Sequence, residues 1–458
     1  MSEINFNIYQ SPFSWRYGSA QMRELFSEIN RRKTWRKVWV ALAKSQNKLG
    51  LISKEELEDI VKHQDEIDIE TAHKIEEELK HDLMAELKTF ASQAKVGGGK
   101  IHFGATSQDI EDNADTLLMS GALGIIEKDL KSLLKELSKR IEENKDLVCM
   151  AYTHLQPAEP TTLGYRFSFY TQDLLTDLEL LHFVKAQLKG KGLKGAVGNS
   201  ASYFALLGEK SESLEKEVLT DLGIEAFDVT TQVYPRKLDF LVLSLLSSIA
   251  GSLYKFAFDI RILQSAGFGE IQEPFGEKQV GSSAMPFKRN PILSERICSI
   301  ARHLVNLSRT AWDNAAHSLL ERTLDDSAAR RIILPESFLA TDEILNQSIK
   351  IVSGMNINKD QIKNNLEKYG PFASSEAVMM QAVKNGADRQ MVHELIRNYA
   401  MDSYASNTPL SDLLEKDEVI KKYLNQQEIK EALDYSKHIG LASKKSAQMI
   451  DKIKKAVV

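Results

Sequence analysis

The sequence predicts an almost entirely helical protein, and three observations carry this prediction. Long runs lack proline and are rich in Leu, Lys, Glu and Ala, which are residues that favour helix. Strand-like alternation is scarce, and no Asn-Gly hairpin signal separates alternating segments. Apolar residues recur at helical spacing through three long segments, at 112–147, 162–188 and 236–264. The all-α class follows from these patterns.

The segment at 236–264 is apolar on nearly every face of the helix it would form. A helix of this kind must be surrounded, either inside a bundle or between subunits. At about 1.5 Å rise per residue, the three long helices would run roughly 40–50 Å. We therefore expect an elongated bundle of long helices that includes a subunit interface.

The chain of 458 residues is too long for one compact core, so several domains are expected. We predict three helical domains. The N-terminal domain covers 1–110 and ends near a run of three glycines, the central long-helix bundle covers 111–355, and the C-terminal domain covers 356–458. The C-terminal hundred residues carry no motif that indicates a function.

Composition describes an ordinary protein of a reducing compartment. The only two cysteines, Cys149 and Cys298, argue against a disulfide framework, and neither has metal-ligand spacing. The N-terminus lacks an apolar signal core, and the apolar stretch at 240–254 is shorter than a membrane span. A net charge of −5 disfavours nucleic acid as a partner. We expect a cytoplasmic protein with no metal, no membrane partner and no nucleic-acid partner.

The most informative stretch is GSSAMPFKRNP, at 281–291. Gly281 and two serines favour a mobile polar turn, and two prolines interrupt helix on either side of Lys288 and Asn290. Such a loop could close over an anion, with a serine oxygen at one end and cations at the other. This arrangement suits removal of a proton beside a carboxylate. The simpler alternative is a solvated basic turn before a helix.

Two further segments carry candidate groups. His154, in YTHLQPAEPTT, lies in polar, non-periodic chain before a long helix, and it can donate a proton near neutral pH. A lone histidine is nevertheless more often structural. The segment ERTLDDSAARR, at 321–331, offers guanidinium forks and a hydroxyl suited to phosphate, although surface ion pairs would give the same pattern.

These strings together resemble those of the fumarase/aspartase superfamily, and most of all its adenylosuccinate lyase family. MPFKRNP followed by SER at 294–296 resembles the loop of that family, and the segment at 321–331 resembles its phosphate-binding segment. KHDLMAE at 80–86, which we expect to place its His-Asp pair mid-helix, and IHFGATSQD at 101–109 are similar to its "RHD" and "GATS" motifs. SPFSWRYGS at 11–19 resembles its nucleotide-contacting segment. Together the matches extend from 11 to 331.

The resemblance implies β-elimination of fumarate from adenylosuccinate, giving AMP, and from the succinylated carboxamide ribotide SAICAR, giving AICAR, with no cofactor. It implies that His154 is the general acid, that Glu295 orients it, and that Ser282 is the base, a choice over Ser283 that physics alone does not make. It also implies a homotetramer that builds each site from three subunits. The implied substrate contacts are Arg16, Tyr17, Lys80, His81, Asp82, Thr106, Ser107, Thr153, Gln232, Lys288, Asn290, Arg296, Arg322, Ser327 and Arg331, with His102 in support.

Three departures and three alternatives accompany this interpretation. Lys80 stands where the family has arginine, and Pro235 and Phe287 stand where more polar residues are expected. Another fumarate-releasing lyase, such as argininosuccinate lyase, is one alternative, although its substrate has no phosphate to explain Arg322 and Arg331. A catalytically silent structural homologue is the second, as lens crystallins of this superfamily are, and basic-patch nucleic-acid binding is the third.

Overall fold

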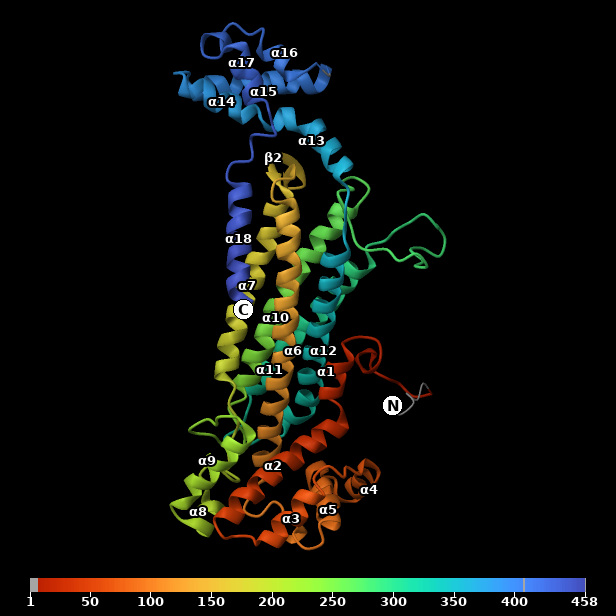
Figure 1. Ribbon diagram of the computed structural model, residues 1–458, viewed down its shortest axis with the longest axis vertical. Coiled ribbons are helices and arrows are strands. Elements are labelled where there is room, and N and C mark those ends of the chain that lie inside the picture. The colour runs from red at the N-terminus through yellow and green to blue at the C-terminus, as the bar shows by residue number, and fades with distance from the viewer. Residues whose placement is uncertain (1–6, 407, 458) are drawn as a thin grey trace. The chain divides into compact units, whose positions relative to one another are not determined.

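The computed structural model describes residues 7–406 and 408–457, and it consists mainly of α-helices (Figure 1). Its longest helices are α6 (Ser107–Asn144), α7 (Leu163–Gln187), α10 (Lys237–Gln264), α11 (Ile292–Ala316) and α12 (Asp325–Gly354). The all-α prediction is confirmed. The long segments expected from apolar periodicity correspond to α6, α7 and α10, with ends that differ by a few residues.

The chain forms two compact units, each assembled from separated stretches of sequence. Unit 1 holds the described residues up to Asp129, together with Asp177–Gly251 and Ser299–Asn346. Unit 2 holds Leu130–Thr176, Ser252–Cys298 and the described residues from Gln347 onward. Each of the five long helices therefore contributes residues to both units. The predicted domain boundaries near 110 and 355 stay a prediction.

The short helices of unit 1 pack around α2. Trp35, Trp39 and Leu42 of α2 share one buried core with Phe90 and Tyr203. Serine side chains begin several of these helices, because a side-chain oxygen accepts a hydrogen bond from a free amide of the first turn. The elements are η1 (Pro12–Ser14), α1 (Ala20–Leu25), α2 (Glu28–Lys48), α3 (Lys54–Lys62), α4 (Ile69–Leu79), α5 (Asp82–Gln93), η2 (Gly98–Lys100), α8 (Ala201–Leu207) and α9 (Lys210–Leu222).

A buried ion triad joins α2 to α5 within unit 1. Glu86 accepts from Arg36 Nε at 2.6 Å and from Arg32 Nη1 at 2.9 Å, and all three side chains are at most 1% exposed. The carboxylate holds two guanidinium groups that have left water, so its charge is needed to offset their desolvation. This triad fixes the spacing between α2 and α5. It therefore also helps to position His81 and Asp82 at the start of α5.

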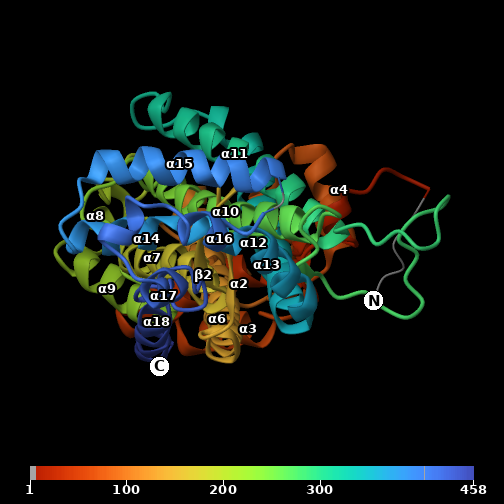
Figure 2. The same cartoon turned by 90° about the horizontal axis from the view of Figure 1, so that it is seen from above.

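The C-terminal helices of unit 2 form a small core of their own. Figures 1 and 2 show α14, α15, α16 and α17 side by side, and their apolar side chains share one buried cluster. Val378, Val392, Leu414 and Ile429 are among its members. The elements are α13 (Lys359–Ala373), α14 (Ser375–Lys384), α15 (Arg389–Ser406), α16 (Leu410–Leu414), η3 (Ile420–Lys422), α17 (Gln426–Ala432) and α18 (Ala442–Ala456).

Unit 2 also contains short strands that the sequence did not predict. β1 (Val148–Thr153) pairs antiparallel with β2 (Gln156–Thr162), and β3 (Ile271–Gln272) pairs with β4 (Asn356–Ile357). The prolines of β2 concealed the first pair, because proline normally marks the end of regular structure. They are tolerated here because a two-stranded ribbon has only edge strands, and the register shifts near them.

One described helix, α10, is long and apolar enough to cross a membrane by length and composition alone. Its 28 residues exceed the shorter stretch at 240–254 considered in the sequence analysis. The mean hydropathy of its most apolar window is 1.6, and half of that window is buried inside the structure. Leu243, Leu246 and Ile249 are among the fully buried residues, as expected for a core helix.

Replacement of Glu86 tests the importance of the buried triad. Glu86→Gln removes the charge that two buried guanidinium groups share, so we expect the free energy of unfolding to fall by about 3–5 kcal/mol. Denaturant unfolding followed by circular dichroism measures this loss. Glu58→Gln, which breaks an exposed pair with Lys54, is the matched control and should leave stability unchanged. Equal stability of the two variants would contradict the prediction.

Candidate active site

The N-terminal segment of unit 1 positions Arg16 and Tyr17 just after η1. Both backbone amides donate to the carbonyl of Pro12, at 2.8 and 3.0 Å. The Arg16 guanidinium lies over the rings of Trp15 and Tyr17, and Arg16 is exposed. The following residue, Gly18, has a φ of 81° and donates its amide to Glu343 of α12 at 3.0 Å. The two predicted contacts are therefore held against α12 by the backbone.

The junction of α4 and α5 carries Lys80, His81 and Asp82. These residues are not mid-helix, as the sequence analysis expected. Lys80 takes a left-handed conformation with a φ of 55°, which ends α4, and His81 is extended directly before α5. The turn exposes His81, whose Nε2 lies 3.4 Å from the hydroxyl of Ser107. Two predicted substrate contacts, His81 and Ser107, thus meet although they are far apart in sequence.

Asp82 forms an ion pair with Arg331, between Oδ2 and Nη2 at 2.6 Å. Burial tends to raise the pKa of Asp82, but the Arg331 guanidinium outweighs it and holds the pKa below its usual value. The Asp82 carboxylate is therefore ionised at neutral pH. This pair joins the "RHD"-like segment to the segment at 321–331.

His102 is the supporting histidine, and it is tied into the core. Its Nδ1 accepts a hydrogen bond from the Trp39 indole at 3.0 Å, so the neutral ring carries its proton on Nε2. Burial lowers the pKa of His102 to about 4; Asp109 opposes this shift and His81 adds to it. His102 is thus neutral at pH 7 and acts as a structural support for the turn that follows.

The turn after His102 leads to Thr106 and Ser107, and α6 begins at Ser107, earlier than the long segment expected from 112. The Thr106 amide donates to Asp109 Oδ2 at 3.0 Å, which satisfies one free donor at the start of the helix. Asp109 is fully buried, and its other oxygen contacts the Lys191 ammonium and the amide of Lys194. Asp109 is therefore a structural carboxylate, and the Ser107 hydroxyl is left for other partners.

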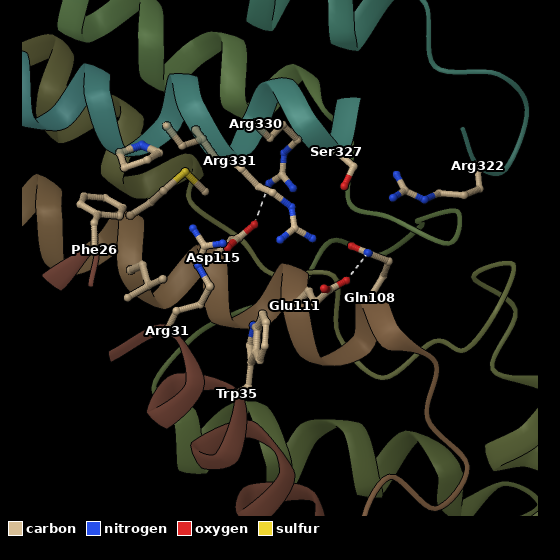
Figure 3. A pocket seen from close by; sticks show the side chains of 14 residues that line it. Phe26, Arg31, Trp35, Gln108, Glu111, Asp115, Arg322, Ser327, Arg330 and Arg331 are labelled. Atoms are coloured by element: carbon tan, nitrogen blue, oxygen red, sulfur yellow. Dashed lines mark hydrogen bonds and ion pairs between the residues drawn. The ribbon is translucent and has the colours of Figure 1, made fainter. Parts of the chain in front are cut away.

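A cavity in unit 1 is lined by the three residues that we predicted to bind a phosphate group, Arg322, Ser327 and Arg331 (Figure 3). Gln232 reaches the same segment through its backbone, because its amide donates to the carbonyl of Glu321 at 3.1 Å. Arg31 of α2 also lines the cavity, and its guanidinium has no hydrogen-bond or ion-pair partner within residues 7–406 and 408–457. This surplus of guanidinium groups favours an anionic ligand.

The arginines around this cavity are held by a buried network that the sequence analysis did not identify. Asp326 accepts from Arg236 Nε at 2.6 Å and from Arg322 Nη1 at 2.9 Å. Arg330 is bound by Asp239 at 2.7 Å and by Asp115 at 3.0 Å. The pattern that resembled surface ion pairs is therefore mostly buried. The spacing of residues along a helix cannot by itself distinguish surface ion pairs from a buried network.

Unit 2 holds His154, at the tip of the β1–β2 hairpin. The sequence analysis placed it in irregular chain before a long helix, but the structure places it in a two-residue turn. His154 and Leu155 have φ values of 54° and 59°, which is the geometry that lets two residues connect twisted strands. Neither residue is glycine, so the turn is strained, as backbone at functional sites often is. The imidazole is exposed, and Thr153 precedes it at the end of β1.

A buried carboxylate anchors the hairpin. Glu270 accepts from Tyr152 at 3.2 Å, from Arg166 at 3.1 Å and from Asn365 at 3.0 Å. Arg166 also donates to the carbonyl of Met150 at 2.6 Å. These bonds tie β1 to α7 and α13, so the tip that carries His154 has a rigid base.

Ser282 lies on the loop between β3 and α11, and this loop projects away from both elements (Figures 1 and 2). Its Oγ accepts from the amides of Ala284 and Met285, at 3.3 and 3.1 Å. Two amide donors aimed at one hydroxyl oxygen also stabilise that oxygen when it carries negative charge. Ser283 is exposed and receives no such bond within the described chain. The hydrogen bonds of the loop thus distinguish Ser282 from Ser283, which the sequence alone did not.

The loop is closed on itself by Asn290, whose side-chain amide donates to the carbonyl of Gly281 at 2.8 Å. A Cβ at Gly281 would lie 2.0 Å from the carbonyl oxygen of Lys288, so only glycine fits there. Lys288 is exposed, while Glu273 accepts from the amides of Leu293 and Ser294 and so fixes the start of α11. Lys288 and Asn290, which we predicted to bind the substrate carboxylates, therefore lie on a loop whose two ends are fixed.

The chain does not bring every predicted partner together. Glu295 and Arg296 lie in the first turn of α11, and Glu295 is exposed. No hydrogen bond or ion pair joins Glu295 to His154, or His154 to Ser282, in the part of the chain that the structure describes. The predicted roles of these residues stay predictions.

One group of side chains within the described residues could hold a metal ion by proximity. Donor atoms of Glu159, Glu376 and His438 lie within 4.8 Å of one another. A hydrogen bond between the two carboxyl groups raises the pKa of Glu159. Both carboxyl groups are exposed, and exposed acidic groups commonly approach each other without an ion. We assign no metal to them.

The sequence matches the model of a family described as lyase over residues 16–305. Solved structures give the same fold. One, of a fumarate lyase from Mesorhizobium, has a TM-score of 0.86, 24% identity and coverage of 97% of this chain and 99% of that one. Another, of a 3-carboxy-cis,cis-muconate lactonizing enzyme from Pseudomonas putida, has a TM-score of 0.87, 24% identity and coverage of 98% and 100%. The matching family model, together with this shared fold, defines a lyase of the fumarase/aspartase superfamily.

Curated relatives narrow this class. Adenylosuccinate lyase of Saccharomyces cerevisiae is 38% identical over 98% of this chain and 95% of its own, and that of Archaeoglobus fulgidus is 36% identical over 96% and 97%. A second family model, described as adenylosuccinate lyase C-terminus, matches residues 371–449, where the sequence analysis found no motif. The chain belongs to the adenylosuccinate lyase family.

The buried imidazole of His102 predicts a pH dependence of stability. Its pKa of about 4 lies below the ordinary 6.5, so the unfolded chain binds more protons between these values. Its contribution is complete above pH 6.5, and we expect roughly 3 kcal/mol to be lost as pH falls toward 4. His102→Asn keeps an acceptor for Trp39 without titrating, so it should reduce this slope. Denaturant unfolding at several pH values measures both proteins, and identical slopes would contradict the assignment.

Proposed function

We propose that this chain cleaves adenylosuccinate to AMP and fumarate, and cleaves SAICAR to AICAR and fumarate. The observation that carries the proposal is the convergence of Arg322, Ser327 and Arg331 on one cavity, in a chain whose full-length relatives are adenylosuccinate lyases. Both substrates bear a phosphate, which guanidinium forks and a hydroxyl bind well. Argininosuccinate bears none and would leave these groups without a ligand.

In the proposed mechanism, Ser282 removes the proton from the carbon beside a succinyl carboxylate. The amides of Ala284 and Met285 already point at its Oγ and would stabilise the charged form. His154 gives a proton to the leaving nitrogen as the carbon–nitrogen bond breaks and the double bond of fumarate forms. Lys288 and Asn290 would hold the succinyl carboxylates. Proton transfer and electrostatics complete the reaction, so we propose no cofactor.

The proposed site is assembled from several subunits of a homotetramer. The phosphate group ligands belong to unit 1, whereas the proposed acid and base belong to unit 2. Within the described residues of one chain, His154 has no bond to its proposed orienting partner Glu295. Large apolar side chains also stay exposed in a single chain, among them Phe169 and Phe258. A partner subunit that covers them and supplies the missing groups explains both observations.

We further propose a cytoplasmic location without a membrane or nucleic-acid partner. The two buried cysteines form no disulfide within the described residues, as is usual in a reducing compartment. The net charge of −5 opposes general attraction to phosphate backbones. The small anionic substrates are instead attracted by cations gathered locally in the site.

A substrate panel tests the proposed function. Purified protein should release fumarate from adenylosuccinate and from SAICAR, and should release none from argininosuccinate. Arg322→Ala should raise KM for adenylosuccinate at least about tenfold, because one charged hydrogen bond contributes roughly 1.5–3 kcal/mol. Arg309→Ala, which removes an exposed guanidinium from α11, is the control and should leave KM unchanged. Activity on argininosuccinate alone would overturn the proposal.

The loop geometry predicts a difference between two neighbouring serines. Ser282→Ala removes the hydroxyl that two amides face, so we expect kcat to fall at least about a hundredfold with little change in AMP affinity. Ser283→Ala changes an exposed hydroxyl of the same loop and should keep most of the activity. Steady-state fumarate release and calorimetric titration with AMP measure the two quantities. Equal losses in the two variants would remove Ser282 as the base.

A further inference from the structure

Glu111 lines the same cavity as the phosphate group ligands, although no motif singled it out. Figure 3 shows its carboxyl group on α6, facing the side of the cavity that carries Ser327 and Arg331. The side-chain amide of Gln108, one turn earlier on α6, donates to Glu111 Oε2. A carboxyl group is an unexpected member of a site for a dianion, because an ionised carboxylate would repel it.

The surroundings of Glu111 favour its neutral form. Burial, together with the carboxylates of Asp82, Asp115 and Asp112, raises the pKa of Glu111 to about 8, and Arg331 opposes this shift. The charged groups around the cavity come from every element that borders it. They are Arg31 of α2, Asp82 of α5, Asp112 and Asp115 of α6, Arg322 of the preceding loop, and Arg330 and Arg331 of α12.

Most of these charges are already committed to one another. Asp115 is paired with Arg330 at 3.0 Å, and Asp82 is paired with Arg331 at 2.6 Å. Glu111 accepts from a neutral amide and forms no ion pair within the described residues. It is therefore the group in this cavity whose charge can change near physiological pH without breaking a salt bridge.

We propose that protonation of Glu111 controls the binding of a phosphate group. A phosphate-bearing ligand binds only when the Glu111 carboxyl is protonated. The proposal rests on the proposed function and adds a regulator to the same site. A protonated carboxyl donates its O–H to a phosphate oxygen, while the other carboxyl oxygen still accepts from Gln108. Loss of that proton removes the donor and places a negative charge beside the ligand. Glu111 acts as a binding residue and takes no part in bond cleavage.

The pH dependence of AMP binding tests this proposal on the full-length protein. AMP is a dianion throughout pH 7–9, because the second pKa of a phosphate monoester is about 6. If only the protonated form binds, Kd of the wild-type protein rises about tenfold between pH 7 and pH 9. Glu111→Gln keeps an acceptor for Gln108 and cannot ionise, so its Kd should stay constant over this range. Adenosine lacks the phosphate, and its affinity should not follow pH in either protein.

The outcomes separate this proposal from the proposed function. A wild-type Kd for AMP that does not change between pH 7 and pH 9, in a protein that cleaves adenylosuccinate, overturns only the role of Glu111. Retention of the wild-type slope in Glu111→Gln does the same. Failure of the wild-type protein both to bind AMP and to cleave adenylosuccinate overturns the function and the role together.

Two controls keep the variant informative. Glu136→Gln alters a partly buried carboxylate on the same helix, which pairs with Lys139, and it should retain the wild-type slope. Glu111→Met also removes the titrating group and has a similar length, so it replaces Glu111→Gln if that variant is not folded by circular dichroism. A slope in Glu111→Met equal to that of the wild-type protein also overturns the proposal.

Discussion

The binding cavity depends on the buried network of arginines and aspartates at the start of α12. Asp326 holds Arg236 and Arg322 at once, and Arg330 is held between Asp239 and Asp115. Such charges are costly to remove from water unless each has a partner. The network meets this requirement and fixes the direction in which Arg322 points, while Asp82 holds Arg331. The guanidinium groups proposed to bind the phosphate are therefore held in place before any ligand arrives, which reduces the reorganisation that binding would require.

The two units supply different chemistry to the proposed reaction. Unit 1 contributes arginines that ion pairs hold in place near the start of α12, and the Glu86 triad joins α2 to α5 in the same unit. Unit 2 contributes groups at exposed turns, with His154 on a hairpin tip and Ser282 on a loop. A binding group gains from rigidity, whereas groups that transfer protons must approach the substrate and then release the product. The placement of each residue type agrees with its proposed role.

Sequence patterns predicted those parts of the molecule that local rules control. Apolar periodicity located α6, α7 and α10, and short strings located the segments that carry Ser327 and Arg331. The turn at His154 was missed, because a left-handed conformation at a residue other than glycine leaves no mark in composition. Glu111 was missed because burial decides its charge, although its spacing to Asp115 and Leu118 placed it on an inward helical face.

His154 and Leu155 both adopt left-handed backbone conformations, and this bears on how proteins with this hairpin evolve. Each of these positions would be more stable with glycine or asparagine, so the present residues are kept at a cost to folding. A related protein that no longer catalysed a reaction would gain stability if glycine or asparagine replaced these two residues. The backbone strain at the hairpin tip therefore supports the proposed role of His154, because a position without a role would favour a residue suited to this conformation.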